Sequence, residues 1–147
     1  MARKKDNPKK TDKKLSYYKR VAKNIEYKVE KMFGGKRIPL SGSSWLKGDV
    51  ITDEYLIEVK TRTFNSTTIW IDPKWVEQTL RQAEIMKRKP LLVIYDRKAK
   101  NFWRVDFTDE PCSPEKHSFG FFDTELCIKG RKCYASLLPR PSCKRKR

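Results

Sequence analysis

With 147 residues, the chain has room for one compact domain with a modest hydrophobic core and little more. Lys and Arg total 35 against 18 Asp and Glu, and the formal net charge of +17 favours a polyanionic partner, above all nucleic acid. No apolar run approaches the ~20 residues of a membrane-spanning helix, and the N-terminus lacks the apolar stretch of a signal peptide. These features predict an intracellular protein, in the cytoplasm or the nucleoid, without a membrane partner.

The basic side chains are concentrated at both ends of the chain. Residues 1–14 hold seven Lys and Arg, contain a proline and lack apolar periodicity, which predicts a disordered basic tail. Residues 139–147 hold five more and form a second basic tail. Residues 15–138 are expected to fold as a single domain, and this part of the chain is itself basic.

The folded part begins with an amphipathic segment. Apolar residues recur at helical spacing from Ser16 to the glycine pair at 34–35, which predicts a helix with Ser16 as its N-cap. Residues 36–40 are predicted to be extended, and the Ser- and Gly-rich residues 41–44 to form a loop.

Three β-rich segments come next. Residues 49–51 and 55–62 are predicted as two strands joined by a turn at residues 53–54. Residues 67–71 are rich in β-branched and aromatic side chains and are predicted as a third strand.

A second helix follows, with Asp72 as its cap and Pro73 in its first turn, running to about Lys87 and ended by Pro90. Residues 91–95 are an unbroken apolar run, typical of a strand buried on both faces. Further strands are expected at residues 101–107, 119–122 and 134–138. This order predicts an α/β fold with a central mixed β-sheet of about five strands flanked by helices.

One segment carries an unusual set of charges. Side chains alternate between the two faces of a strand, so Glu58 and Lys60 point the same way, opposite to the apolar Tyr55, Ile57 and Val59. The predicted turn folds Asp49 back beside Glu58. Burying such charges is costly unless they are paired or bind a metal. Two carboxylates and a lysine suit Mg²⁺-assisted phosphodiester hydrolysis, with Lys60 orienting water or stabilising charge in the transition state.

These residues resemble a known family. Gly48-Asp49 followed by Glu58-Val59-Lys60, after a helix that bears glutamate, is similar to the PD-(D/E)XK nuclease superfamily, and the short Ser-Gly loop resembles that of the archaeal Holliday junction resolvases and their phage relatives. A glycine stands where the family pattern has proline before the aspartate. The resemblance implies a restriction-endonuclease-like core, Mg²⁺ as cofactor with Mn²⁺ able to substitute, and a homodimer acting on branched DNA, in a phage or archaeal setting.

The resemblance also assigns roles to single residues. A glutamate of the first helix would complete the metal ligands with Asp49 and Glu58; Glu26 fits the spacing better than Glu30, one turn away. A loop serine, Ser41 or Ser43, would assist catalysis. The expected nucleic-acid contacts are Arg37, Ser43, Ser44, Lys47 and Arg62. Gln78 and Gln82 could adjoin the site but are better explained as helix-surface side chains.

Two alternatives remain open on the sequence. A basic nucleic-acid-binding protein without catalysis would explain the charge, but it has no need for Asp49 and Glu58 amid basic residues. The four cysteines contain no CxxC pair and are best explained as lone intracellular thiols. The exception would be a zinc site, whose ligands would be Cys112, His117, Cys127 and Cys133.

Overall fold

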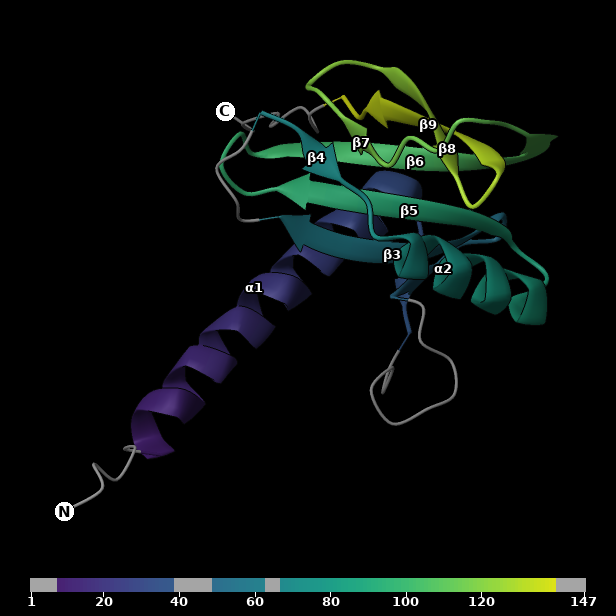
Figure 1. Cartoon of the computed structure of the whole chain (residues 1–147). Coiled ribbons are helices and arrows are strands. Elements are labelled where there is room, and N and C mark those ends of the chain that lie inside the picture. Colours follow the sequence, from purple (N-terminus) through teal and green to yellow (C-terminus); the bar gives the residue numbers. More distant parts are fainter. Residues whose placement is uncertain (1–7, 39–48, 63–66, 140–147) are drawn as a thin grey trace, which may run out of the picture.

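The computed structural model describes residues 8–38, 49–62 and 67–139, which form two helices and nine strands (Figure 1). In chain order these are α1 (Pro8–Phe33), β1 (Lys36–Arg37), β2 (Val50–Ile51), β3 (Tyr55–Arg62), β4 (Ile69–Trp70), α2 (Pro73–Met86), β5 (Lys89–Asp96), β6 (Asn101–Pro111), β7 (Ser118–Phe119), β8 (Thr124–Ile128) and β9 (Arg131–Leu137). Neither helix in this part of the chain combines the length and the apolar character needed to cross a membrane.

Seven strands form one mixed sheet in the order β1-β2-β3-β5-β6-β9-β8. Strands β3 and β5 are parallel, because the chain returns through α2 between them, and the other neighbours are antiparallel. The predicted α/β class and mixed sheet are confirmed. The predicted count of about five strands is wrong, because the short β1 pairs at one edge of the sheet and β8, which was not foreseen, pairs with β9 at the other.

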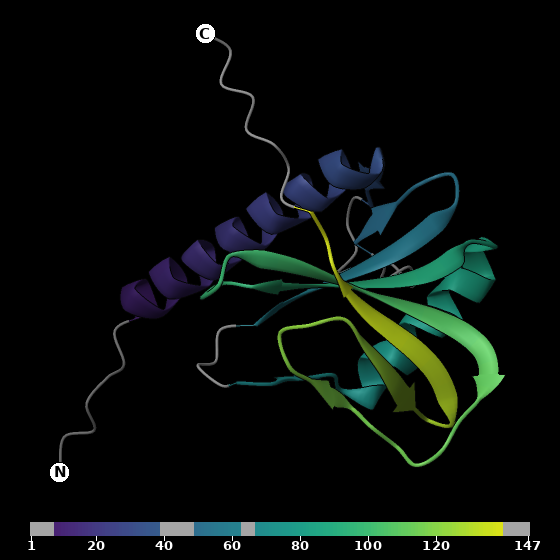
Figure 2. The ribbon, with the colours of Figure 1, turned by 90° about the horizontal axis from the view of Figure 1, so that it is seen from above.

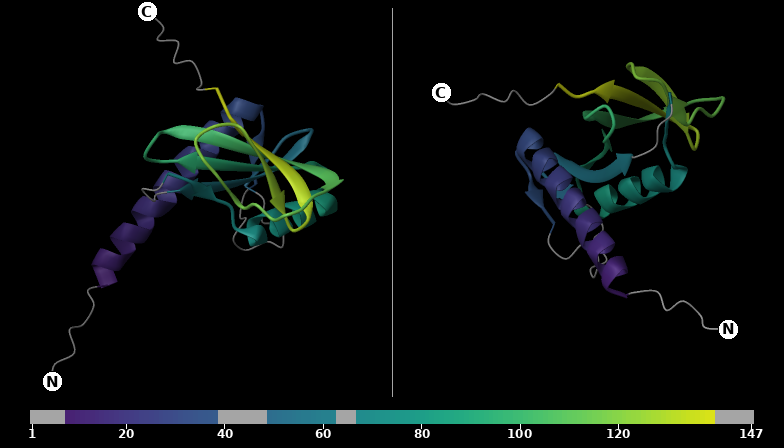
Figure 3. Two further views of the ribbon diagram at one scale, coloured as in Figure 1. Left: turned by 45° about the horizontal axis from the view of Figure 1, so that its top comes forward. Right: turned by 90° about the vertical axis from the view of Figure 1, so that its left-hand side faces the viewer.

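The two helices cover opposite faces of the sheet (Figure 3). From α1, Ile25 and Val29 pack against Ile57 and other residues of one face. From α2, Val76 packs over the opposite face beside Leu92 and other residues. Leu92 alternates along β5 with residues of the first cluster, so the sheet is apolar on both faces, as expected for a central parallel pair.

Helix α1 begins earlier than predicted. It starts at Pro8 rather than after Ser16, so residues 8–14, expected in a disordered tail, are helical. Lysine is a good helix former, and the segment extends a helix already anchored further along. The first turns of α1 lie beyond the sheet, and its later turns pack on it (Figures 1 and 2).

Helix α2 follows the local signals in the sequence. The Asp72 side chain accepts a hydrogen bond from the Lys74 N–H (2.9 Å), and Pro73 stands at the first position. The helix ends because Lys87 adopts a left-handed conformation, φ 54°, with its N–H directed to carbonyls of the last turn. Pro90, predicted to end the helix, instead lies in β5.

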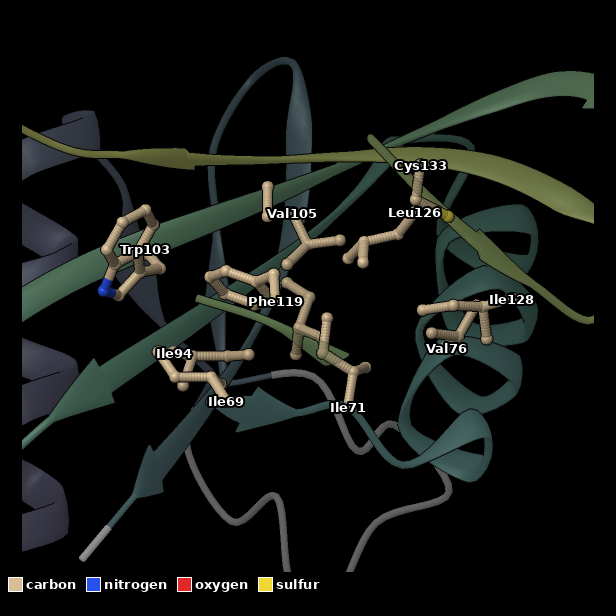
Figure 4. Close-up of a cluster of buried hydrophobic side chains, with 12 residues drawn as sticks. Ile69, Ile71, Val76, Ile94, Trp103, Val105, Phe119, Leu126, Ile128 and Cys133 are labelled. Atoms are coloured by element: carbon tan, nitrogen blue, oxygen red, sulfur yellow. The ribbon is translucent and has the colours of Figure 1, made fainter. Parts of the chain in front are cut away.

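The segment predicted as a third strand leaves the main sheet. Strand β4 pairs with β7 in a two-stranded ribbon, with Ile69 opposite Phe119. Both side chains are buried beside Trp103 in the core on the α2 side (Figure 4). The ribbon therefore covers the part of the sheet that α2 leaves open.

The C-terminal third contains a disulfide. Cys112, just after β6, is bonded to Cys127 of β8, so the prediction of lone thiols is wrong for this pair. Cys133 is buried with a free thiol, and Cys143 lies outside the described residues. Since two of the four suggested zinc ligands are bonded to each other, this arrangement leaves no zinc site of the suggested kind.

Candidate active site

Strand β3 carries two of the candidate catalytic residues on the face that α2 covers. In the parallel register with β5, Glu58 stands beside Leu92 and Lys60 beside Ile94. Both neighbours belong to the core on the α2 side. Glu58 is only 5% exposed, so its carboxyl group is largely removed from water although the strand has no structural need for a charge there.

Asp49 lies where the β2–β3 ladder ends. Its N–H donates to the Ile57 carbonyl (3.0 Å), and its Oδ2 accepts a hydrogen bond from the Val59 N–H (2.8 Å). The Asp49 carboxylate thus accepts the Val59 N–H in place of a further backbone carbonyl of the β2–β3 ladder. At the other end of the hairpin, the Thr52 hydroxyl accepts the N–H of Tyr55 and closes the turn. The hairpin fixes Asp49 near Glu58.

Helix α1 contributes the third carboxyl group. Glu26 is hydrogen-bonded to Asp49, whereas Glu30, one turn later, pairs with Arg37 (Oε2 to Nε, 3.2 Å). Of the two glutamates that the sequence offered, Glu26 therefore lies against Asp49, and Glu30 is engaged with Arg37 instead. Glu26, Asp49 and Glu58, from three separate elements, are called the carboxyl cluster below.

Burial raises the pKa of all three groups, and the charge of Asp49 adds to this for Glu26 and Glu58. Burial, then the Asp49 charge, raises the pKa of Glu26 to about 7, although Arg37 and Lys23 oppose the shift. Burial, then the Asp49 charge, likewise raises the pKa of Glu58 to about 7 against the pull of Lys60. The pKa of Asp49 is also raised by burial, opposed mainly by its bond to the Val59 N–H. Near neutral pH, Glu26 and Glu58 are therefore each only partly ionised.

Lys60 is the cation of the carboxyl cluster. Its Nζ lies 3.2 Å from Glu58 Oε1 and 5.7 Å from the centroid of the Trp75 ring on α2. The side chain retains 28% exposure, so the ammonium is both oriented and accessible. Nothing in the sequence pattern signals this contact between Lys60 and Trp75.

The donor set of the carboxyl cluster is suited to a hard divalent cation. Three carboxyl groups supply oxygen ligands of the kind that Mg²⁺ prefers. As they stand, no three Asp, Glu, His or Cys side chains of the described residues are close enough to enclose a metal ion. The hydrogen bond between Glu26 and Asp49 requires one of the two carboxyl groups to keep its proton, and the raised pKa of Glu26 makes that residue the donor.

The predicted nucleic-acid contacts have different outcomes. Arg37 is 43% exposed, beside Glu30, at the rim of the carboxyl cluster. Arg62 is buried, with Nη1 3.9 Å from Asp96 and its guanidinium over the Phe121 ring, so it does not fit the predicted phosphate clamp. The remaining predicted residues, Ser41, Ser43, Ser44 and Lys47, lie outside the described residues.

Helix α2 departs from prediction at one glutamine. Gln82, expected on the helix surface, is 7% exposed, whereas Gln78 is partly exposed. The apolar stripe of α2 is therefore broken by a buried amide.

A separate pocket of about 550 Å³ opens near Tyr55, at the other end of β3. Its acidic side chains include Asp106, held by Arg104 in two hydrogen bonds of 2.7 and 2.8 Å, and Asp109, paired with Arg131 at 2.7 Å. These charges are already neutralised by partners. The carboxyl cluster, with more acid than base, is the better candidate for chemistry.

No protein-family model, curated protein or solved structure matches this chain. Any functional conclusion therefore depends on the geometry and chemistry of the carboxyl cluster.

Proposed function

We propose that this protein is a divalent-metal-dependent nuclease that hydrolyses phosphodiester bonds of DNA. The observation that carries the proposal is the convergence of Glu26, Asp49 and Glu58 beside Lys60. Packing alone gives no reason to gather three carboxyl groups, since burial raises all three pKa values, repulsion by Asp49 raises those of Glu26 and Glu58 further, and the ionised forms are thereby destabilised. A bound divalent cation would stabilise the ionised carboxylates and offset the cost of bringing them together.

Each residue has a distinct role in this proposal. Asp49, held by the Val59 N–H, and Glu58, held by Lys60, would hold the cation, and Glu26 would join them after losing its proton. A bound Mg²⁺ supplies Lewis-acid stabilisation of the phosphate and lowers the pKa of a water molecule. Lys60 orients the attacking water or offsets negative charge on the phosphate as the bond to the leaving oxygen breaks.

Charge supports a nucleic acid as substrate. The net charge of +17 provides long-range attraction for a polyanion. Next to the carboxyl cluster, α1 exposes Lys19, Arg20 and Lys23, and the Lys23 charge acts on Glu26. A protein that only binds DNA would gain nothing from acids in this basic surrounding, where they repel phosphate.

The finer assignment comes from the resemblance to PD-(D/E)XK nucleases, particularly the Holliday junction resolvases. In its support, the hairpin of β2 and β3 carries the Asp and Glu-x-Lys residues, α2 crosses to a parallel β5, and α1 brings a glutamate to the same place. We therefore propose a restriction-endonuclease-like core, an intracellular homodimer and a branched DNA substrate.

The test is an incision assay on a labelled four-way junction and a matching linear duplex, with Mg²⁺, Mn²⁺ or EDTA. Asp49→Asn keeps an acceptor for the Val59 N–H but removes the charge, and Glu30→Gln is the matched control on the same site's rim. We expect metal-dependent nicks from the wild type and the control, and binding without incision from Asp49→Asn.

Cutting of the duplex as well as the junction would support the chemistry and refute branch specificity. Binding by all three proteins with no incision in any metal would contradict the proposal and leave a basic nucleic-acid-binding protein.

A further inference from the structure

The outer face of the β4–β7 ribbon presents large aromatic side chains to solvent. Trp70 is 55% exposed and Phe122 is 69% exposed, the two highest values among the exposed large apolar side chains of the described residues. Aromatic rings of this size normally contribute to a core, as the Phe119 ring of the same ribbon does together with Ile69 opposite it. The side of the ribbon that faces the core is therefore buried, whereas Trp70 and Phe122 are exposed to solvent.

The strand register places the chain segments that carry Trp70 and Phe122 side by side. Trp70 stands opposite Ser118, and Gly120 follows directly after β7. The Phe122 ring lies over Gly120, since a Cβ added there would be 3.0 Å from Phe122 Cε1.

The turn that carries Phe122 is held in place. The Thr124 hydroxyl donates to the Phe122 carbonyl (2.8 Å), and the Leu137 N–H donates to Asp123 Oδ1 (3.0 Å). The neighbouring Phe121 ring, itself 45% exposed, lies over the Arg62 guanidinium (5.6 Å). The exposed ring of Phe122 is thus presented by a fixed backbone, which reduces the entropy lost when a ligand stacks on it.

Charge indicates what stacks there. Lys116 is exposed and, two residues before Ser118, faces the same way as that residue and Trp70. The nearest acids of the segment are engaged, Glu115 with His117 and the Gly130 N–H, and Asp123 with the Leu137 N–H. Arg62 lies on the same face of β3 as Glu58 and Lys60. Its contact with Phe121 places the turn after β7 beside the strand that carries Glu58.

We propose that the Trp70–Phe122 face stacks unpaired bases of a nucleic acid whose backbone reaches the carboxyl cluster. This inference rests on the proposed nuclease function and narrows its substrate class to DNA with single-stranded or splayed bases at or near the cut. Aromatic rings beside a cation bind such bases without regard to sequence, since every base has a π face.

The test measures binding in EDTA, by fluorescence anisotropy, to a twelve-residue oligothymidylate and to an abasic oligomer of equal length and charge. We expect Trp70→Ala and Phe122→Ala each to weaken binding of the oligothymidylate by about 5- to 150-fold, the range for losing one stacked base, and to leave the abasic oligomer unaffected. Ile85→Ala is the control, since Ile85 is 46% exposed on α2, away from the ribbon.

Three outcomes would overturn the proposal. The first is equal binding of both oligomers by the wild type, and the second is unchanged oligothymidylate binding by both ribbon variants with wild-type melting temperatures. The third is a shift from dimer to monomer on sedimentation, caused by Trp70→Ala or Phe122→Ala, which would make the face a contact between two copies. Because the assay contains no metal and requires no incision, its result is independent of whether the carboxyl cluster is catalytic.

Discussion

Replacing Glu26 by glutamine is expected to stabilise the metal-free protein at alkaline pH, although Glu26 is a proposed metal ligand. The pKa of Glu26 is about 7 in the folded protein and near 4.5 in the unfolded chain. The folded state therefore retains a proton that the unfolded state releases. The stability that this proton contributes is fully present below pH 4.5 and is lost as the pH rises through 7. Glutamine keeps a hydrogen-bond donor for Asp49 and never ionises.

The magnitude follows from the two pKa values. Between pH 5.5 and pH 8, ionisation of Glu26 lowers the free energy of unfolding by about 2 kcal/mol in an unscreened site. Glu26 is not fully buried, so solvent screening reduces the expected gain of Glu26→Gln over this range to about 1–2 kcal/mol. For a chain of this length, that corresponds to a rise of about 3–8 °C in melting temperature relative to the wild type.

The assay is urea or thermal unfolding in EDTA at pH 5.5 and pH 8. Glu30→Gln serves as control, because Glu30 lies one turn away and pairs with the half-exposed Arg37. That variant should lose less than about 1 kcal/mol, by a similar amount at both pH values. The reasoning is refuted if Glu26→Gln differs from the wild type equally at both pH values, or is less stable than the wild type at pH 8.

Three further measurements test other parts of the structure. Mg²⁺ at one hundred times its dissociation constant should raise the wild-type free energy of unfolding by about 2.7 kcal/mol at pH 8, and Asp49→Asn should lose most of this gain. Leu92→Ala, at a fully buried position, should cost about 2–5 kcal/mol in urea unfolding, and a cost below about 1 kcal/mol would contradict the packing. Replacing Cys112 and Cys127 together by serine should cost about 3 kcal/mol under oxidising conditions, since their bond closes a loop of fifteen residues. A reductant should lower the melting temperature of the wild type but not of the double variant.

The sequence by itself was sufficient where the determining interactions are local. The start of α2 follows from Asp72 and Pro73. The alternation along β3 places Glu58 and Lys60 on one face of the strand and the apolar Ile57 and Val59 on the other. A short hairpin brings Asp49 back to β3 because strands separated by a tight turn pair with each other. Each of these features depends on residues within about ten positions of one another.

Other features were decided only by tertiary packing. Glu26 and Glu30 share one helical face, and only the docking of α1 on the sheet directs the first to Asp49 and the second to Arg37. Arg62 has the sequence context of an exposed strand end, yet it is buried against a side chain of the neighbouring β5.

The β4–β7 ribbon and the disulfide were likewise unpredictable from local pattern. Strand β4 pairs with β7, about fifty residues away, and Cys112 is bonded to a cysteine of the unforeseen strand β8. A strand's own sequence specifies its alternation but not its partner, since any strand edge offers the same backbone donors and acceptors. The partner is selected by how the buried faces fit together, and that is settled only when the whole core has assembled.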